Sequence, residues 1–329
     1  MTNTNHPARI IVVGSANQDY IVRVPTPPGP GETVLATSLL LQPGGKGANQ
    51  AVAAARLRGN VSFVASVGDD ADGALLLREL RSEGVDTANV EIINRGRTGL
   101  ALVSVYDSGE NSITVVPGTN FSLTADRVNH VVTALAEQAE SAILVAQAEI
   151  LPEIIEAAIV SAARAGVRVI LNLAPFHPLV PELLKKCDPL VLNEAEASAL
   201  VGSEVRDASS AASAVAQLRS IAESVVVTIG PAGAYWADQE SEGHVPAPEV
   251  SEVVDTTGAG DAFVGALASH LARGASLRES VELGVLAGTF AVQMPGAQSS
   301  YPTPADLGMN SLAPGHGAAA VLGHGSPTP

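Results

Sequence analysis

A glycine-rich turn that ends in a carboxylate lies near the C-terminal end of the chain, in the run Asp255-Thr256-Thr257-Gly258-Ala259-Gly260-Asp261. A helix is expected to follow it, over residues 261–273. Backbone N–H groups at a helix N-terminus stabilise anions, because the peptide dipoles are aligned there. A carboxylate is poorly suited to bind a phosphate at such a place, so we expect Asp261 to act as a base beside one. The simpler alternative is an N-cap aspartate after a glycine-rich turn.

A second glycine-rich segment, Pro43-Gly44-Gly45-Lys46-Gly47-Ala48-Asn49-Gln50, leads into an alanine-rich stretch that is typical of a helix. Consecutive glycines let the backbone approach a ligand closely, because no Cβ is in the way. Lys46 and Asn49 supply a cation and an amide, which can bind hydroxyl groups or a phosphate. The segment is not a P-loop, because the spacing between Gly and Gly-Lys-Ser/Thr is absent.

Composition limits the classes of partner. The chain has 329 residues, a net charge of −16, 46% hydrophobic residues and only 3% aromatic residues. It can bury a large core of Ala, Val, Leu and Ile, while its negative charge argues against nucleic acid and anionic membranes as partners. An acidic protein that binds a nucleotide needs local positive groups, such as a divalent ion, a lysine or backbone N–H groups.

Several features favour a cytoplasmic protein. The single cysteine, Cys187, excludes an intrachain disulfide. Residues 1–9 are short and polar, without the apolar region of a signal peptide. No uncharged apolar run reaches about 18 residues, so we expect no membrane span.

Strand and helix patterns alternate along most of the chain, which predicts an α/β fold with a mostly parallel sheet covered by helices on both faces. Short β-branched runs typical of buried strands occur at 10–14, 61–65, 142–145, 167–172, 190–192 and 224–228. Helical stretches between them are expected at 48–58, 70–83, 124–138, 151–165, 194–201 and 208–222. Ligands of such sheets bind beyond the carboxyl ends of the strands. Asn193, Thr228 and Asp261 all follow predicted strands.

Three segments interrupt this alternation, at about 17–24, 32–41 and 98–116. The last contains a hairpin-like pair, 99–106 and 112–116, joined by a turn-rich linker. We interpret these segments as a small antiparallel sheet inserted into the α/β body. An exposed apolar face on this sheet would need a cover, which favours a homodimer. From about residue 305 to 329 the chain is rich in Gly, Pro, Ala and Ser, which predicts a disordered tail.

Taken together, these motifs resemble the ribokinase branch of the PfkB-type carbohydrate kinases. The resemblance covers a single kinase domain at about 10–303 and excludes the tail. The motifs that carry it, in order, are Gly14-Ser15-Ala16-Asn17-Gln18-Asp19, Pro30-Gly31-Glu32-Thr33, Gly45-Lys46-Gly47-Ala48-Asn49-Gln50-Ala51, Thr98-Gly99, Gly109-Glu110-Asn111, Asn193 with Glu196, Thr228-Ile229-Gly230, Gly258–Asp261 and Gly296-Ala297-Gln298.

The resemblance implies a ribokinase-like fold with the small sheet as a lid over the sugar and as a dimer surface. It implies ATP-dependent phosphorylation of D-ribose at O5, which gives ribose 5-phosphate. The alternatives are a related kinase of deoxyribose, a nucleoside or a ketohexose, and a non-catalytic sugar-binding protein on the same scaffold. The last is disfavoured because Asp261, Gly258 and Gly260 are intact.

The resemblance also implies roles for residues of the sugar site. Asp261 would be the base, and Gly258, Ala259 and Gly260 would form the anion hole with it. The sugar would be bound by Asn17, Asp19, Gly45, Lys46, Asn49, Glu149 and Asp261. A surface turn at Asn17 and Asp19, and an exposed strand end at Glu149, are the simpler alternatives.

For ATP, the resemblance implies contacts from Asn193, Thr228, Gly230, Gly233 and Gly260. Glu196 would reach Mg²⁺, directly or through water, although Asn193 and Glu196 also have the spacing of a helix capping box. A K⁺ site beside the anion hole would use Asp255, Thr257, Ala291, Met294, Gly296 and Ser300.

Two positions depart from the family pattern. Gly284-Val285-Leu286 stands where a His or Asn is usual near the adenine, which leaves the nucleotide preference open. Met294-Pro295 replaces a more basic stretch.

Overall fold

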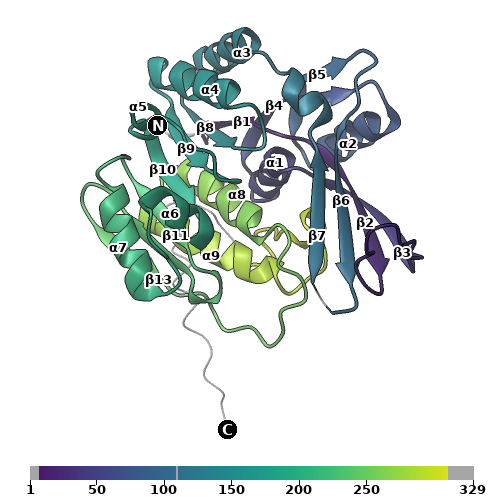
Figure 1. Cartoon of the computed structure of the whole chain (residues 1–329). Coiled ribbons are helices and arrows are strands. Elements are labelled where there is room, and N and C mark those ends of the chain that lie inside the picture. The colour runs from purple at the N-terminus through teal and green to yellow at the C-terminus, as the bar shows by residue number, and fades with distance from the viewer. Residues whose placement is uncertain (1–6, 109, 310–329) are drawn as a thin grey trace.

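The computed structural model describes residues 7–108 and 110–309, which form an α/β body and a smaller sheet beside it (Figure 1). Within these residues, the larger sheet has nine strands in the order β13-β12-β11-β10-β9-β8-β1-β4-β5. Its strands are β1 (Arg9–Val13), β4 (Asn60–Gly68), β5 (Asp86–Ile93), β8 (Ala142–Gln147), β9 (Arg168–Asn172), β10 (Cys187–Leu192), β11 (Val225–Thr228), β12 (Ala234–Ala237) and β13 (Glu242–Val245). Neighbouring strands are parallel from β5 to β11, and β12 is antiparallel to both of its neighbours, β11 and β13.

Helices cover both faces of this sheet, as the alternating pattern predicted. Strand β1 shows why, because Ile10 and Val12 belong to one core cluster and Ile11 and Val13 to the other. Side chains of successive strand residues point to opposite faces, so a strand that is apolar throughout needs a cover on each. On the first face lie α1 (Lys46–Arg56), α2 (Ala71–Ser82), α8 (Ala259–Leu271) and α9 (Leu277–Ala291); on the second lie α3 (Ala125–Glu137), α4 (Pro152–Arg164), α5 (Pro181–Leu184), α6 (Glu194–Val201) and α7 (Ala208–Leu218).

The smaller sheet, which we call the lid, has the order β3-β2-β6-β7. Its strands are β2 (Asn17–Val24), β3 (Ser38–Gly44), β6 (Gly99–Tyr106) and β7 (Asn111–Val116). The prediction of an antiparallel sheet was wrong in one pairing, because β2 and β6 are parallel. The strand predicted within 32–41 lies later, at β3, since 32–37 has no strand conformation.

Other elements were missed from the sequence. Strands β5, β12 and β13 and helices α5 and α9 were not predicted, and short 3₁₀ helices occur at η1 (Gly118–Ser122), η2 (Gly230–Ala232) and η3 (Gln298–Ser300). Leu307 and Met309 are only 7% and 8% exposed and join the core, so packed structure extends past residue 305. The rest of the predicted tail, 310–329, lies outside the described residues, as does Gly109.

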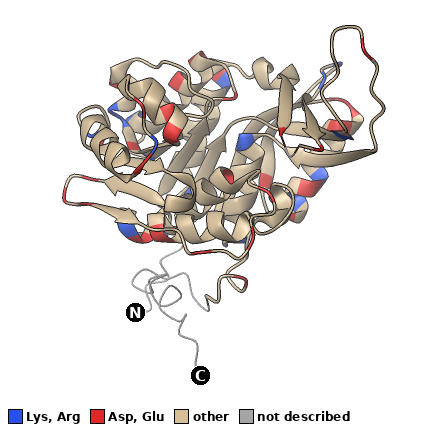
Figure 2. Ribbon diagram, turned by 60° about the horizontal axis from the view of Figure 1, so that its bottom comes forward, with Lys and Arg blue, Asp and Glu red and all other residues tan. Residues whose placement is uncertain are grey.

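Acidic residues are spread around the molecule (Figure 2). Over the whole chain, 34 Asp and Glu outnumber 18 Lys and Arg. Among the described residues, no helix is long and apolar enough to cross a membrane.

Candidate active site

The site lies where the two sheets meet, at the carboxyl end of β1. Strand β1 ends at Val13 and the chain continues through Gly14–Ala16 into lid strand β2. The N-terminus of α1 lies against this crossing. Gly45 has φ +86°, and a Cβ there would come within 2.8 Å of the Asn17 nitrogen, while one on Gly47 would come within 2.6 Å of the Ser15 nitrogen. Glycine is therefore required at both positions, and the N-terminus of α1 is held beside Asn17 and Asp19.

Asp261 lies in the first turn of α8 and is 6% exposed. The helix begins after Gly258, which has φ +77° and is the N-cap. Asn49 Nδ2 donates to Asp261 Oδ2 at 3.0 Å, and Gln50 Nε2 donates to Oδ1 at 2.9 Å. Asp261 therefore does not cap α8 with its side chain, which removes the simpler N-cap interpretation.

The pKa of Asp261 is raised above its ordinary value, because the effect of burial outweighs the opposing effects of the Lys46 ammonium and of the hydrogen bonds from Asn49 and Gln50. In turn, the Asp261 carboxylate raises the pKa of Lys46 above its ordinary value, with smaller contributions from Glu149 and Glu196. The ionised forms of this lysine and this aspartate thus stabilise each other inside the protein.

Two further carboxylates share this cluster. Glu149 Oε2 accepts a hydrogen bond from Ser15 Oγ at 2.6 Å and one from the Lys46 N–H at 3.0 Å. Glu149 is thus fixed at the N-terminus of α1 and is not a free strand end. Burial, with the nearby charges of Glu149 and Asp261, raises the pKa of Asp19 from 3.8 to about 7. Asp19 Oδ1 is buried and has no hydrogen-bond partner among the described residues.

Asn17 is also buried, at 3% exposure. Its Oδ1 accepts from Asn120 Nδ2 at 2.7 Å, and Asn120 Oδ1 accepts from the Ala16 N–H at 2.9 Å. Asn120, in η1, therefore fixes the orientation of the Asn17 amide, which leaves Asn17 Nδ2 as the group available to a ligand. A surface turn at Asn17 and Asp19 is excluded, because both residues lie in strand β2, which pairs with β3 and β6.

The proposed anion hole contains two glycines with different constraints. A Cβ on Gly258 would lie 2.7 Å from Tyr301 Oη and 2.8 Å from Ala297 Cβ, so packing requires glycine there. A Cβ on Gly260 would meet nothing within 4 Å. Gly260 is exposed, and the space above the first turn of α8, around Ala259 and Gly260, is open. Such an N-terminus can accept an anion without rearrangement.

Asn193 and Glu196 form the capping box of α6. Asn193 Oδ1 accepts from the Glu196 N–H and Glu196 Oε2 accepts from the Asn193 N–H, both at 2.9 Å. Glu196 is nevertheless 8% exposed, burial raises its pKa, and its charge interacts with Lys46 and Asp261. The pair therefore caps α6, and Glu196 also places a carboxylate within reach of the charges of Lys46 and Asp261.

The other predicted nucleotide contacts lie around the end of β11. Thr228 ends this strand, and Gly230 and Gly233 have φ +46° and +93°. A Cβ on Gly233 would lie 2.0 Å from the Val245 carbonyl oxygen, so the turn before β12 explains this glycine without a ligand. Gly284, near the expected adenine site, is buried against Phe263, and Val285 and Leu286 are 5% and 7% exposed. These three residues belong to the core.

The predicted cation ligands are partly brought together. Asp255 accepts hydrogen bonds from the Thr257 N–H and the Gly296 N–H, both at 2.9 Å. Burial opposes the ionisation of Asp255, but these bonds outweigh it and lower its pKa. Met294 donates its N–H to the Ala291 carbonyl at 3.1 Å. Ser300 is fully buried and donates its hydroxyl to the Ala297 carbonyl at 2.7 Å.

Sequence reasoning missed a set of buried amides that contact the site residues: Gln50, Asn120, Gln147, Asn172 and Gln298. Gln50 and Gln298 lie within the motifs quoted above, but their residue type does not reveal a partner. Gln147 offered a signal, because it interrupts an apolar buried strand two residues before Glu149. A buried polar residue in such a place needs a hydrogen-bond partner.

The chain matches the model of the pfkB family of carbohydrate kinases over residues 7–304, and it belongs to that family. It is 36% identical to ribokinase of Haemophilus influenzae over 295 residues, which cover 89% of this chain and 95% of that protein. It is 35% identical to deoxyribokinase of Salmonella typhimurium over 299 residues, with the same two coverages. The structure of Arabidopsis thaliana ribokinase with ribose and ATP is similar, with a TM-score of 0.83 at 31% identity, covering 96% of this chain and 99% of that one.

Proposed function

We propose that this protein transfers the γ-phosphoryl group of ATP to O5 of D-ribose, with Asp261 as the general base. One observation carries the proposal above the others. A buried carboxylate lies at the N-terminus of α8 beside an open turn, and both of its oxygens accept amide hydrogen bonds. Ribokinases at 31–36% identity over most of the chain support ribose as the acceptor.

The polar groups at the end of β1 would bind the sugar. Asp19 and Glu149 would accept hydrogen bonds from its hydroxyl groups, and Asn17 Nδ2, Asn49 and Lys46 would donate to them. Gly45 would allow the ring to approach the backbone. Asp19 supports this assignment, since a buried oxygen without a partner gains most from a ligand hydroxyl.

In the chemical step, Asp261 would accept the proton of the O5 hydroxyl as that oxygen attacks the γ-phosphorus. The bond from the γ-phosphorus to the bridging oxygen breaks, and ADP leaves. The N–H groups of Ala259, Gly260 and Asp261 would stabilise the charge on the transferred group. The nucleotide would lie along Asn193, Thr228, Gly230 and Gly233.

The charge of ATP requires cations near a protein this acidic. In the described residues no group of three or more His, Cys, Asp or Glu could hold a metal, so Mg²⁺ would be bound by the phosphates, water and Glu196. Mg²⁺ would neutralise the phosphate charge. K⁺ would be held by Asp255, Thr257, Ala291, Met294, Gly296 and Ser300. Asp255 fits this role because its lowered pKa keeps it ionised and because it binds the N–H groups of both Thr257 and Gly296.

2-Deoxyribose is the second candidate acceptor, because deoxyribokinases are about as similar to this chain as ribokinases are. We also propose a kinase domain near 10–303, a homodimer formed through the lid and a location in the cytoplasm. The lid supports the dimer, since Leu40, Ile113 and Val115 are 51%, 58% and 48% exposed on it.

Release of ADP from Mg-ATP would be measured with D-ribose, 2-deoxyribose, fructose and adenosine, each in K⁺ and in Na⁺. The proposal predicts the highest kcat/KM for ribose and faster turnover in K⁺. A higher kcat/KM for 2-deoxyribose would identify it as the acceptor in place of ribose. No turnover with any acceptor would contradict the kinase assignment. Equal rates in the two salts would contradict the K⁺ site.

A further inference from the structure

Asp261 is held by two buried amides that are themselves held by glutamines. Asn49 and Gln50 donate to its two carboxylate oxygens. An amide can turn by half a rotation, which exchanges its donor and acceptor ends. What fixes each amide therefore decides whether Asp261 faces an N–H group or an oxygen.

The first outer contact comes from η3. Gln298 Nε2 donates to Asn49 Oδ1 at 3.0 Å, and Asn49 Nδ2 then donates to Asp261 Oδ2 at 3.0 Å. Gln298 and Asn49 are each 6% exposed, so bulk water is a poor substitute for either contact. The residues are 249 positions apart in the sequence.

The second outer contact comes from β8. Gln147 Nε2 donates to Gln50 Oε1 at 2.7 Å, which leaves Gln50 Nε2 to donate to Asp261 Oδ1 and to Asn172 Oδ1, both at 2.9 Å. Gln147 is completely buried and Gln50 is 1% exposed. Each oxygen of Asp261 thus ends a chain of the form glutamine to amide to carboxylate.

We propose that Gln298 and Gln147 are positioning residues for the phosphoryl transfer proposed above: by donating to Asn49 Oδ1 and Gln50 Oε1, they keep both amide N–H groups directed at Asp261. The inference rests on that proposed function. Without Gln298, the Asn49 amide could turn and place its oxygen against the carboxylate. Asp261 would then take up a proton at higher pH, and Asn49 would present the wrong group to the sugar.

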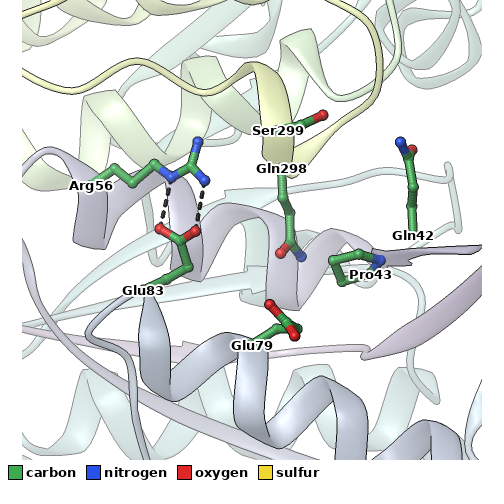
Figure 3. Close-up of a pocket in the computed structure, with 7 residues that line it drawn as sticks. All are labelled: Gln42, Pro43, Arg56, Glu79, Glu83, Gln298 and Ser299. Carbon is green, nitrogen blue, oxygen red and sulfur yellow. Dashed lines mark hydrogen bonds and ion pairs between the residues drawn. The ribbon is translucent and has the colours of Figure 1, made fainter.

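Gln298 can be changed without disturbing the core. It lines a cavity of about 190 Å³ together with residues of β3, α1 and α2. Figure 3 shows its side chain between the Arg56–Glu83 pair on one side and Pro43 and Gln42 on the other. A substitution there meets existing space, so the fold should survive it.

The other charged and titratable groups that act on Asp261 come from several elements, and the variants leave all of them in place. The charges of Lys46 and Glu149 act on the pKa of Asp261. The charge of Asp261 in turn acts on the pKa of Asp19, Glu196 and Tyr301. A change in the pH profile of the uncharged Gln298→Met variant would therefore report on the amide contact.

The test compares Gln298→Met, which removes the donor, with Gln298→Glu, which replaces it with an acceptor. Gln42→Met and Gln42→Glu are matched controls, because Gln42 lines the same cavity and makes no side-chain hydrogen bond to Asn49. For each protein, kcat/KM for ribose is measured from pH 5 to 9, and ribose binding without ATP is measured by calorimetry.

We expect both Gln298 variants to lose about tenfold or more in kcat/KM and in ribose affinity, with the acid limb of kcat/KM moved to higher pH and the larger change in Gln298→Glu. Gln147→Met should shift the acid limb in the same direction. Gln298 variants that match the Gln42 controls in pH profile and affinity would overturn the inference. Failure of the unchanged protein to bind or phosphorylate ribose would instead overturn the proposed function.

Discussion

At the scale of the residue, the site brings together carboxylates that repel one another in the absence of substrate. Glu149 and Asp261 act on Lys46 and also on Asp19. Burial, together with these two charges, raises the pKa of Asp19 to about 7. A group with a raised folded-state pKa binds more protons folded than unfolded. Its charge therefore lowers stability as pH rises from 3.8 to about 7, and the full cost is present above that range.

Asp19→Asn should for this reason raise the melting temperature of the ligand-free protein, more at pH 8 than at pH 5, while weakening ribose binding. Differential scanning fluorimetry at the two pH values and ribose titration by calorimetry measure both effects. Asp69→Asn, at an exposed position, is the control and should change neither. A gain that is equal at pH 5 and pH 8 would show that the charge of Asp19 is not its cause.

At the scale of the element, most strands and helices of the α/β body could be predicted from the sequence, because the patterns of apolar residues in buried parallel strands and in amphipathic helices differ. Strand β13 was missed because Glu242–Val245 is short and polar, and β5 because it begins with turn-forming residues. The motifs predicted Asn49 and Asp261. Gln298 and Gln147 could not be predicted, since their roles depend on contacts between segments that only the fold brings together.

The capping box of α6 gives a prediction that separates its two roles. Glu196→Gln should change the free energy of unfolding by no more than about 0.5 kcal/mol, because Gln can also complete a capping box at this helix position. It should raise the Mg²⁺ concentration needed for activity, since it removes a buried negative charge. Asn193→Ala should instead cost about 1 kcal/mol of stability.

Thermal unfolding and the Mg²⁺ dependence of the KM for ATP measure these outcomes. If Glu196→Gln leaves the Mg²⁺ requirement unchanged, Glu196 only caps the helix.

At the scale of the whole molecule, the lid carries an apolar row across all four of its strands. Leu40, Ile21, Val103 and Ile113 are paired in register, two residues along from the row that contains Asp19. Side chains two apart on a strand share a face, so this row extends the face that carries Asp19, one of the proposed sugar-binding residues. Burial of this row against a second copy would also enclose the site.

Leu40→Asp combined with Ile113→Asp should therefore convert the proposed dimer to a monomer, because the charges would be desolvated at the interface. Sedimentation equilibrium measures the mass. Leu39→Asp is the control, because Leu39 is 58% exposed and lies on the opposite face of β3. A doubly substituted protein that still sediments as a dimer would place the interface elsewhere.

The role of Asp261 as the base is tested by measuring the turnover rate and the ribose affinity of Asp261→Asn with ribose and ATP. We expect a fall in kcat of about 10²–10⁴ with loss of the acid limb of the pH profile, because the amide cannot accept the proton. Ribose binding measured by calorimetry should stay within about tenfold, since the side chain keeps its shape. Turnover at the normal rate, with sugar bound normally, would contradict the account.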